Sequence, residues 1–519
     1  MQAETLPLVV VGTGPTAYAA VSALVDAGRT VHVVDIGADL PISVSRAIRT
    51  ASSQPPTSWT EETIAGLDHG ETVTRLAGKL YFGTDTPYRY PTDHSPITHE
   101  AGRLLPVSGS LGGLSNVWGA GILTLSHSEL ASWPVPSQDM RDAYVAVARR
   151  FPIVGCHDSL DSRFPWPFEP AGTPALSSRF RQFVESPKID GPEEVLFGAS
   201  RLLVAPLGQG CTGCGRCLSG CPYGAIFDAR NLFAELIASG AVTYSAGTVV
   251  DSIKETAQGV EVHVTYLDDR CNSTIVGERV LLAAGAVSSV AILQRSGICE
   301  STVTVRDSQV FYVPLILGHR WTDDSTHFTL AQVFAASADP DPARDFQLSI
   351  YDTSPELAQR FELMAPDLLA PLAARFGHRV ARRVVGGIGF LPSELSGSLV
   401  METKAGRTNV KAETSLETRT AIKHVLHRLG RAFLRRQVVL VAPLAQVPGP
   451  GEGFHVGAAL PMTQTPGPTN TDTLGRPLGT KKVHVIDSTV LPRLHPGPTT
   501  FTAMANAHRI ASAISHLRP

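Results

Sequence analysis

The stretch Leu8–Gly37, LVVVGTGPTAYAAVSALVDAGRTVHVVDIG, decides the fold of this 519-residue chain. Its apolar start, Leu8–Val11, is typical of a parallel strand that is buried on both faces. A glycine-rich turn and a helix of small residues follow, and a second expected strand, Thr30–Val34, ends at an acidic side chain. Because these elements fit into about thirty residues, the pattern predicts a βαβ dinucleotide-binding unit.

The turn has the pattern G-x-G-x-x-A, formed by Gly12, Gly14 and Ala17. Gly12 permits the tight turn, Gly14 lets the backbone approach a pyrophosphate, and Ala17 lets the helix lie against the strand. The expected helix, Ala17–Ala27, would offer free N–H groups and a partial positive charge to the phosphates. Asp35 would accept hydrogen bonds from an adenosine ribose. The alternative is a glycine-rich turn in an ordinary α/β domain.

Composition and charge exclude several classes of protein. A hydrophobic content of 43% and a net charge of −3 are typical of a soluble globular protein and leave no basic footprint for nucleic acid. No apolar run reaches the roughly 18 residues of a membrane helix. The start of the chain, MQAETLPLVVVG, has no basic segment of the kind that opens a signal peptide, so we expect a cytoplasmic location.

A second glycine-rich stretch, Ser108–Ser126, could lie against a flat ligand. Gly112 and Gly113 allow a close approach of the backbone, and Asn116 and Trp118 could supply polar and stacking contacts. The alternative is a glycine-rich turn packed on the core.

Later segments return to the nucleotide-binding domain. Val280–Ala284 predicts a buried strand beside the first one, with Gly285 and the helix Ser288–Arg295 after it. Val250, at the end of another expected strand, Ala241–Val250, is a further candidate for cofactor contact. A late strand, Val483–Ile486, ends at Asp487 and precedes the expected helix Thr502–Ile514.

Residues 303–445 have a different pattern, which predicts a domain built on an antiparallel sheet. Apolar residues alternate in three expected strands, and two helical segments accompany them: strands Val310–Leu317, His327–Phe334 and Phe346–Tyr351, and helices near Pro355–Arg375 and Leu416–Arg435. The predicted fold class is therefore α/β, with a Rossmann-like domain interleaved with an α+β substrate domain. The nucleotide domain is expected to consist of three parts, 1–150 with a loop insertion at 38–107, 231–302, and the C-terminal part 446–519. Between them we expect a surface lid at 151–200, a cysteine segment at 201–230 and the substrate domain at 303–445.

Several of these motifs together resemble the glucose–methanol–choline (GMC) oxidoreductases, a family that depends on FAD. The G-x-G-x-x-A turn with its acidic residue matches, and GGLSNVW at Gly112–Trp118 resembles the flavin-contacting motif. GAVSSVAILQRSG at Gly285–Gly297 resembles the second family signature, and DSTVLP at Asp487–Pro492 resembles the closing strand. The resemblance implies FAD as the cofactor, with Asp487 near its ribityl chain or pyrophosphate. Val117 stands where some members carry a histidine bonded to FAD, so we expect non-covalent binding.

The resemblance also implies catalytic residues. HVGAALPM places His455 where the family carries its active-site histidine. The implied reaction is oxidation of an alcohol, in which histidine takes the hydroxyl proton and a hydride moves to flavin N5. The family usually has a second His or Asn before the closing helix, and Pro498 stands at that place. His495 lies three residues earlier and is a candidate for the second role, the alternative being a loop histidine in solvent.

Four cysteines form a motif of their own. Cys211, Cys214, Cys217 and Cys221 match the ferredoxin run C-x2-C-x2-C-x3-C-P, which predicts an iron–sulfur cluster, with [4Fe–4S] as the leading form. A [3Fe–4S] cluster, a zinc site and free thiols are the alternatives. In two-cluster ferredoxins the fourth cysteine serves the other cluster, so a cysteine elsewhere in the chain could complete this one.

A cluster near the flavin would let electrons leave singly to a partner protein, which favours a dehydrogenase over an oxidase. The leading hypothesis is an FAD-dependent dehydrogenase of a polyol, a sugar or a secondary-metabolite alcohol. A flavoprotein lyase or isomerase, and a non-catalytic electron relay, are the other functions that this fold could host.

Overall fold

The computed structural model describes residues 6–68, 79–90, 97–99, 105–186, 194–318, 328–339, 341–352 and 383–517. The expected helix near Pro355–Arg375 lies outside these residues, as does His327 at the start of an expected strand. No helix within the described ranges is long and apolar enough to cross a membrane.

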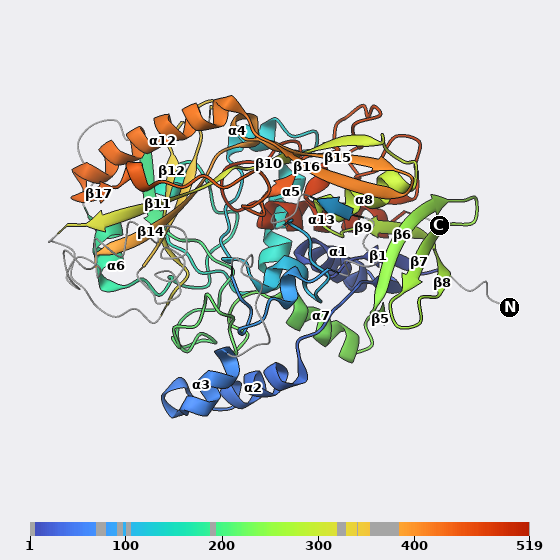
Figure 1. The fold of residues 1–519 in the computed structure, drawn as a ribbon, viewed down its shortest axis with the longest axis horizontal. Coiled ribbons are helices and arrows are strands. Elements are labelled where there is room, and N and C mark those ends of the chain that lie inside the picture. Colours follow the sequence, from blue (N-terminus) through green and yellow to red (C-terminus); the bar gives the residue numbers. More distant parts are fainter. Residues whose placement is uncertain are drawn as a thin grey trace.

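A five-stranded parallel sheet forms the nucleotide-binding domain (Figure 1). Its strands follow the order β19-β9-β1-β2-β5 and come from three separate parts of the chain: β1 (Leu8–Val11), β2 (Val31–Val34), β5 (Thr243–Ser245), β9 (Arg279–Leu282) and β19 (Val483–Val485). The expected return of a middle strand beside the first one is confirmed, because β9 pairs with β1 in parallel register. The two ends and the middle of the chain therefore build one domain.

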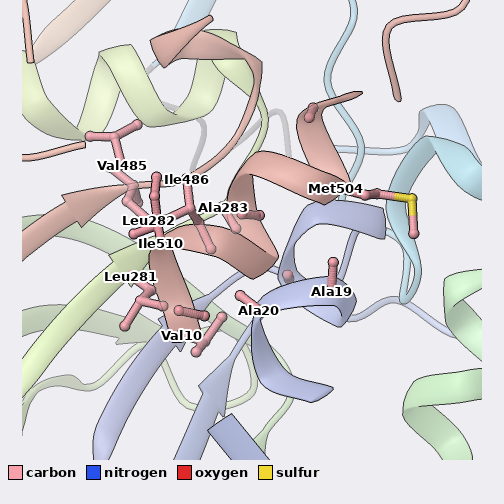
Figure 2. Close-up of a cluster of buried hydrophobic side chains, with 14 of the residues drawn as sticks. Val10, Ala19, Ala20, Leu281, Leu282, Ala283, Val485, Ile486, Met504 and Ile510 are labelled. Carbon is pink, nitrogen blue, oxygen red and sulfur yellow. The ribbon is translucent and has the colours of Figure 1, made fainter. Parts of the chain in front are cut away.

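Two helices pack together on this sheet. α1 (Pro15–Asp26) and α13 (Thr500–Ser515) contact each other along their length. Figure 2 shows Ala19 and Ala20 of α1 in one cluster with Met504 and Ile510 of α13 and with side chains of β1 and β9. Small alanines let the two helices approach closely, and all of these residues are buried. α1 begins at Pro15, two residues before the expected start, because a proline fits the first helical position.

A six-stranded antiparallel sheet forms most of the second domain. Its order is β17-β11-β14-β13-β12-β4, from β4 (Val195–Ala199), β11 (Val310–Leu317), β12 (Ala331–Ser337), β13 (Gln347–Tyr351), β14 (Val384–Phe390) and β17 (Val438–Leu440). The long helix α12 (Leu416–Arg435) covers one face of this sheet (Figure 1). The other face is left for the site described below. β4 comes from the segment predicted as a surface lid, and the structure places it in this sheet.

Two smaller sheets complete the molecule. One is antiparallel and holds β6 (Thr248–Glu255), β7 (Val260–Tyr266) and β8 (Asn272–Gly277). The other follows the order β18-β10-β15-β16-β3, from β3 (Ile97–His99), β10 (Thr302–Asp307), β15 (Ser398–Lys404), β16 (Arg407–Glu413) and β18 (Val456–Gly457). The hairpin of β15 and β16 was not expected from the sequence.

The remaining helices lie between these sheets or project from them. α2 (Ile42–Ser52) and α3 (Glu61–Asp68) occupy the insertion predicted as loops, and Figure 1 shows them projecting at the lower edge. The others are α4 (His127–Ala131), α5 (Ser137–Ala148), α6 (Ser178–Glu185), α7 (Ala229–Ala238) and α8 (Ala286–Arg295).

Replacing Leu282 with Ala is expected to lower the free energy of unfolding by about 2–5 kcal/mol, because the buried side chain would leave a cavity in the core of Figure 2. Leu478→Ala, at a leucine that is 51% exposed, is the matched control and should change it by about 0.5 kcal/mol or less. Urea denaturation followed by circular dichroism measures both variants. Equal losses would contradict the placement of Leu282 in this core.

Candidate functional site

A cavity of about 710 Å³ lies between the parallel sheet and the open face of the antiparallel sheet. Its nucleotide end is lined by the turn after β1, the end of β2 and the start of α8. Its other end is lined by side chains of β11, β12, β13 and β14. The segment before β18 and the segment before α13 also reach it. A ligand in this cavity would touch both domains.

The turn after β1 has the geometry that its glycines predict. Gly12 has a φ of 103°, and a Cβ on it would lie 2.5 Å from the carbonyl oxygen of Ala283. Gly14 lines the cavity and has open space where a Cβ would stand. Gly14 is the residue directly before α1. No side chain caps the free N–H groups at the start of this helix, and its first turn holds no acidic residue. Ala17 is buried behind the turn. Uncapped N–H groups therefore face open space, as a pyrophosphate site requires.

Asp35, at the end of β2, lines the same end of the cavity. The Thr13 hydroxyl donates a short hydrogen bond to its carboxylate. Burial raises the pKa of Asp35 to about 7, against the lowering effect of that bond and of backbone N–H groups. The carboxylate keeps contact with the cavity, where the hydroxyls of a ribose could donate to it.

The second glycine-rich stretch forms the wall opposite α1. Gly112 has a φ of 84°, and a Cβ on it would lie 2.4 Å from the backbone nitrogen of Arg230. Gly113 and Val117 line the cavity, as expected for residues beside a flat ligand. Asn116 does not line it: its amide donates to Asp228 at 2.8 Å, and its oxygen accepts from Ser110 at 3.0 Å. The side chain of Asn116 therefore anchors the loop, which differs from the contact predicted for it.

Asp487, at the end of β19, connects the C-terminal segment to the middle of the chain. Its carboxylate accepts hydrogen bonds from the Ser289 hydroxyl (2.5 Å) and from the N–H groups of Gly285 (3.0 Å) and Thr489 (2.9 Å). Burial raises its pKa, against the lowering effect of these bonds. Gly285, Asp487 and Val250 all line the cavity. The predicted cofactor residues thus converge here, apart from Asn116 and the supporting Ala17 and Gly112.

These observations fit FAD, the cofactor that the sequence resemblance implies. Residues of the βαβ phosphate turn and of the second domain line the same cavity, and a Cβ at Gly12 or at Gly112 would collide with backbone atoms.

His455 lies directly before β18 and lines the cavity. Its ring stacks on Phe390, with centroids 4.3 Å apart and planes at 22°. Within the described residues, its Nδ1 is buried and has no hydrogen-bond partner. Burial lowers the pKa of His455 to about 4, so the ring is neutral near pH 7. A neutral imidazole in a cavity wall can accept a proton.

The backbone around His455 is held tightly. Its carbonyl accepts a hydrogen bond of 2.9 Å from Ser308, at the end of β10. Phe454 and Ala458 flank the segment with φ values of 59° and 47°, a left-handed conformation that non-glycine residues rarely adopt. Such strain persists only where the surrounding structure enforces it, and it is concentrated at functional sites.

His495 lies outside the residues that line the large cavity and faces a small second pocket. Its Nδ1 lies 2.8 Å from Oε1 of Glu129, which lies 3.4 Å from Nη2 of Arg163. Arg163 also pairs with Asp345 at 2.8 Å. Although burial raises the pKa of Glu129, the charges of His495 and Arg163 hold it well below its ordinary value. The structure therefore puts His495 in a buried charge network, while Pro498 lines the cavity; a catalytic role for His495 stays a prediction.

Sequence reasoning missed the aromatic wall that faces His455. Phe334, Tyr312, Tyr351 and Phe390 line the cavity from four different strands. The alternation within each strand could have shown that one face differs from the other, but only the pairing of the strands reveals which residues are neighbours.

The four clustered cysteines lie on one loop between β4 and α7. Cys211 and Cys217 are buried, and Cys214 and Cys221 are partly exposed. Burial raises the pKa of Cys217 to about 12 and that of Cys221 to about 11. The described ranges contain no group of three or more His, Cys, Asp or Glu side chains that could hold a metal ion. The iron–sulfur interpretation therefore stays a prediction.

Two comparisons with known proteins bear on this site. Residues 203–320 match the family model of the GMC oxidoreductases, a segment that includes the Gly285–Gly297 signature. The structure is similar to the crystal structure of pyridoxine 4-oxidase from Mesorbium loti, with a TM-score of 0.59 over 99% of this chain and 100% of that one, at 13% sequence identity. No curated protein sequence matches the chain.

The structural similarity establishes the fold, and the family model covers the cysteine segment and the Gly285–Gly297 signature. Residues 203–320 are therefore similar to the GMC oxidoreductases in sequence, and the whole chain is similar in fold to one solved oxidase structure.

Proposed function

We propose that this protein is an FAD-dependent oxidoreductase that oxidises the hydroxyl group of a small alcohol to a carbonyl. The observation that carries the proposal is His455, which lines the same cavity as the phosphate turn, as a buried ring stacked on Phe390. When bound, FAD accepts the two electrons and the carbon-bound hydrogen that leave the substrate. The name of the structural neighbour, pyridoxine 4-oxidase, is consistent with alcohol oxidation on this fold.

The residues of the chain have separate tasks in this reaction. The turn at Gly12 and Gly14 would hold the phosphates, and Asp35 would hold the ribose. His455 would accept the hydroxyl proton, and its ring is kept in place by Phe390. The apolar wall around the ring excludes water and keeps the imidazole neutral.

Replacing His455 with Ala should lower kcat by about 10²–10⁴-fold, because the proton acceptor is lost. The variant should keep its FAD content, since His455 makes no part of the phosphate or ribose site. Anaerobic bleaching of the flavin absorbance by an alcohol substrate measures the rate, and His427→Ala, at an exposed histidine on α12, is the matched control. A variant with full FAD content and near-normal turnover would refute the role of His455.

The pH dependence follows from the environment of the same ring. Burial lowers the pKa of His455 from its ordinary value of 6.5 to about 4, and only the neutral form accepts a proton. We therefore expect kcat/KM to stay constant from about pH 6 upward and to fall only as the pH decreases toward 4. A profile of flavin reduction against pH tests this; a loss of half the rate near pH 6.5 that is absent in His455→Ala would contradict it.

We also propose an iron–sulfur cluster at the cysteine loop, as a separate proposal on which the alcohol reaction does not depend. The C-x2-C-x2-C-x3-C-P spacing supports it, and three glycines with positive φ (Gly213, Gly215 and Gly220) let the loop turn tightly between the thiols. The N–H of Ala225 donates to the sulfur of Cys221 at 3.3 Å, a contact typical of cluster ligands. Such a cluster would deliver electrons to a partner protein in the cytoplasm.

Protein purified without oxygen should then contain about three to four iron atoms and as many acid-labile sulfides per chain. Cys217→Ser should lower both contents, whereas Cys271→Ser, at an exposed cysteine outside the loop, should not. Metal analysis and electron paramagnetic resonance measure the cluster. Iron-free protein from an anaerobic preparation would remove this proposal and leave the flavin reaction untouched.

A further inference from the structure

One face of the six-stranded sheet forms the wall of the cavity, and its residues are set by the strand register. Tyr312 pairs with Ile388, Ile388 with Ser349, and Ser349 with Phe334. These four residues form one row across β11, β14, β13 and β12, and all of them line the cavity. Four adjacent strands span roughly 14 Å, which is the length of a one- or two-ring molecule.

Two phenyl rings belong to this wall. Phe390, in the neighbouring row on β14, stacks on His455. Phe334, on β12, comes close to Gly121 and Pro498: a Cβ added to Gly121 would lie 3.3 Å from Cζ of Phe334 and 3.0 Å from Cγ of Pro498. A side chain at position 121 would therefore press on Phe334 and Pro498. A flat molecule in this cavity would share it with the rings of Phe334 and Phe390 and with His455.

The polar groups on this face are few. The described residues of this row and of the rows on either side of it carry no charge. Their polar side chains are Tyr312 and Ser349 in the row itself, and Gln347 and Tyr351 in its neighbours. Gln347 donates to the Ser349 hydroxyl at 3.0 Å, so each of these groups already serves the other. The charged side chains that line the cavity belong to other segments: Asp35, Asp487, Glu452 and Lys79, whose ammonium donates to the Trp118 carbonyl at 2.9 Å.

This composition discriminates between classes of alcohol. A sugar or polyol buries many hydroxyl groups, and each one that finds no partner loses its hydrogen bonds to water. An aromatic ring instead gains from contact with Phe334 and Tyr312 and needs partners only for its single hydroxyl. A carboxylate or ammonium group would lie against an uncharged wall without a counter-charge.

We propose that the substrate is an uncharged aromatic carbinol, whose ring lies against the Phe334 wall and whose hydroxyl points to His455. This inference rests on the proposed function and narrows it. The reaction is the one stated above: the hydroxyl proton goes to His455, the carbon-bound hydrogen leaves with two electrons to FAD, and the carbinol becomes the corresponding aldehyde or ketone.

The test compares four alcohols on the FAD-loaded protein without oxygen, with the flavin absorbance as the signal. Benzyl alcohol represents the proposed class, cyclohexylmethanol has the same size without aromaticity, para-carboxybenzyl alcohol adds a charge, and sorbitol is a polyol. We expect the second-order rate constant for flavin reduction to be at least about tenfold higher for benzyl alcohol than for each of the other three.

Variants of the wall test which residue carries the preference. Phe334→Leu keeps an apolar side chain of similar volume and should remove the preference for benzyl alcohol over cyclohexylmethanol. Phe334→Ala should lower the rate constant for benzyl alcohol by about tenfold or more. Val439→Ala, on the outer strand β17 at a valine that is 51% exposed, is the matched control and should behave as the parent protein.

Binding of benzaldehyde, measured by equilibrium dialysis, gives a readout that does not depend on turnover and should weaken in Phe334→Ala. Faster flavin reduction by sorbitol than by benzyl alcohol overturns the aromatic substrate class while the proposed function stands. If no alcohol reduces the flavin, the proposed function fails, and dialysis then decides whether the wall binds aromatic molecules. Unchanged benzaldehyde binding in Phe334→Ala overturns the assignment of the wall.

Discussion

The register of the parallel strands is the constraint on which the rest of the structure depends. Backbone hydrogen bonds join Gly12 to Val34, Ala283 to Val11, and Ile486 to Leu282, so four strands end at one level. The residues that follow these strands therefore meet at a single edge, which is the usual ligand site of a parallel α/β sheet. A shift of one residue in any pair would turn the side chains of that strand to the other face of the sheet and displace the turn that follows it. The glycine turn and the carboxylates that follow these strands can act on one ligand only because the register brings them to the same edge.

Local patterns allowed the parallel sheet and much of its ligand edge to be predicted from the sequence. The first strand, its glycine turn and Asp35 lie within thirty residues, so their geometry follows from neighbouring residues alone. His455 was found in a different way, by resemblance to a family motif, since a histidine in a glycine-rich segment carries no signal of its own. The structure places it on the cavity wall, and its catalytic role stays a prediction until it is tested. Helices α2 and α3 were missed because serine, threonine and proline around them are typical of loops.

The roles of some site residues could not be predicted, because they depend on contacts with residues that are distant in the sequence. Asn116 was expected to face the ligand, but Asp228, more than a hundred residues later, binds its amide. His495 was considered for the second catalytic position, and the structure brings Glu129 to it from α4. In both cases a polar side chain near the site has a buried partner that no local pattern announces, and an unpaired buried group would be costly. The same reason hides the aromatic wall, because its row crosses four strands that are far apart in the chain.

The surroundings of His455 show how these separate constraints act on one group. A neutral imidazole is stable in an apolar wall, whereas its protonated form would lose the hydration of its charge. Near pH 7 the resting ring is therefore ready to take a proton, and the charge that it gains must be balanced during the reaction. Within the described residues, no hydrogen-bond partner reaches the buried Nδ1, and the face of Phe390 lies against the ring. An aromatic face stabilises a neighbouring cation, so this stacking favours the protonated ring as well as holding it in place. The position of the ring depends on the strained backbone at Phe454 and Ala458, which flank the segment.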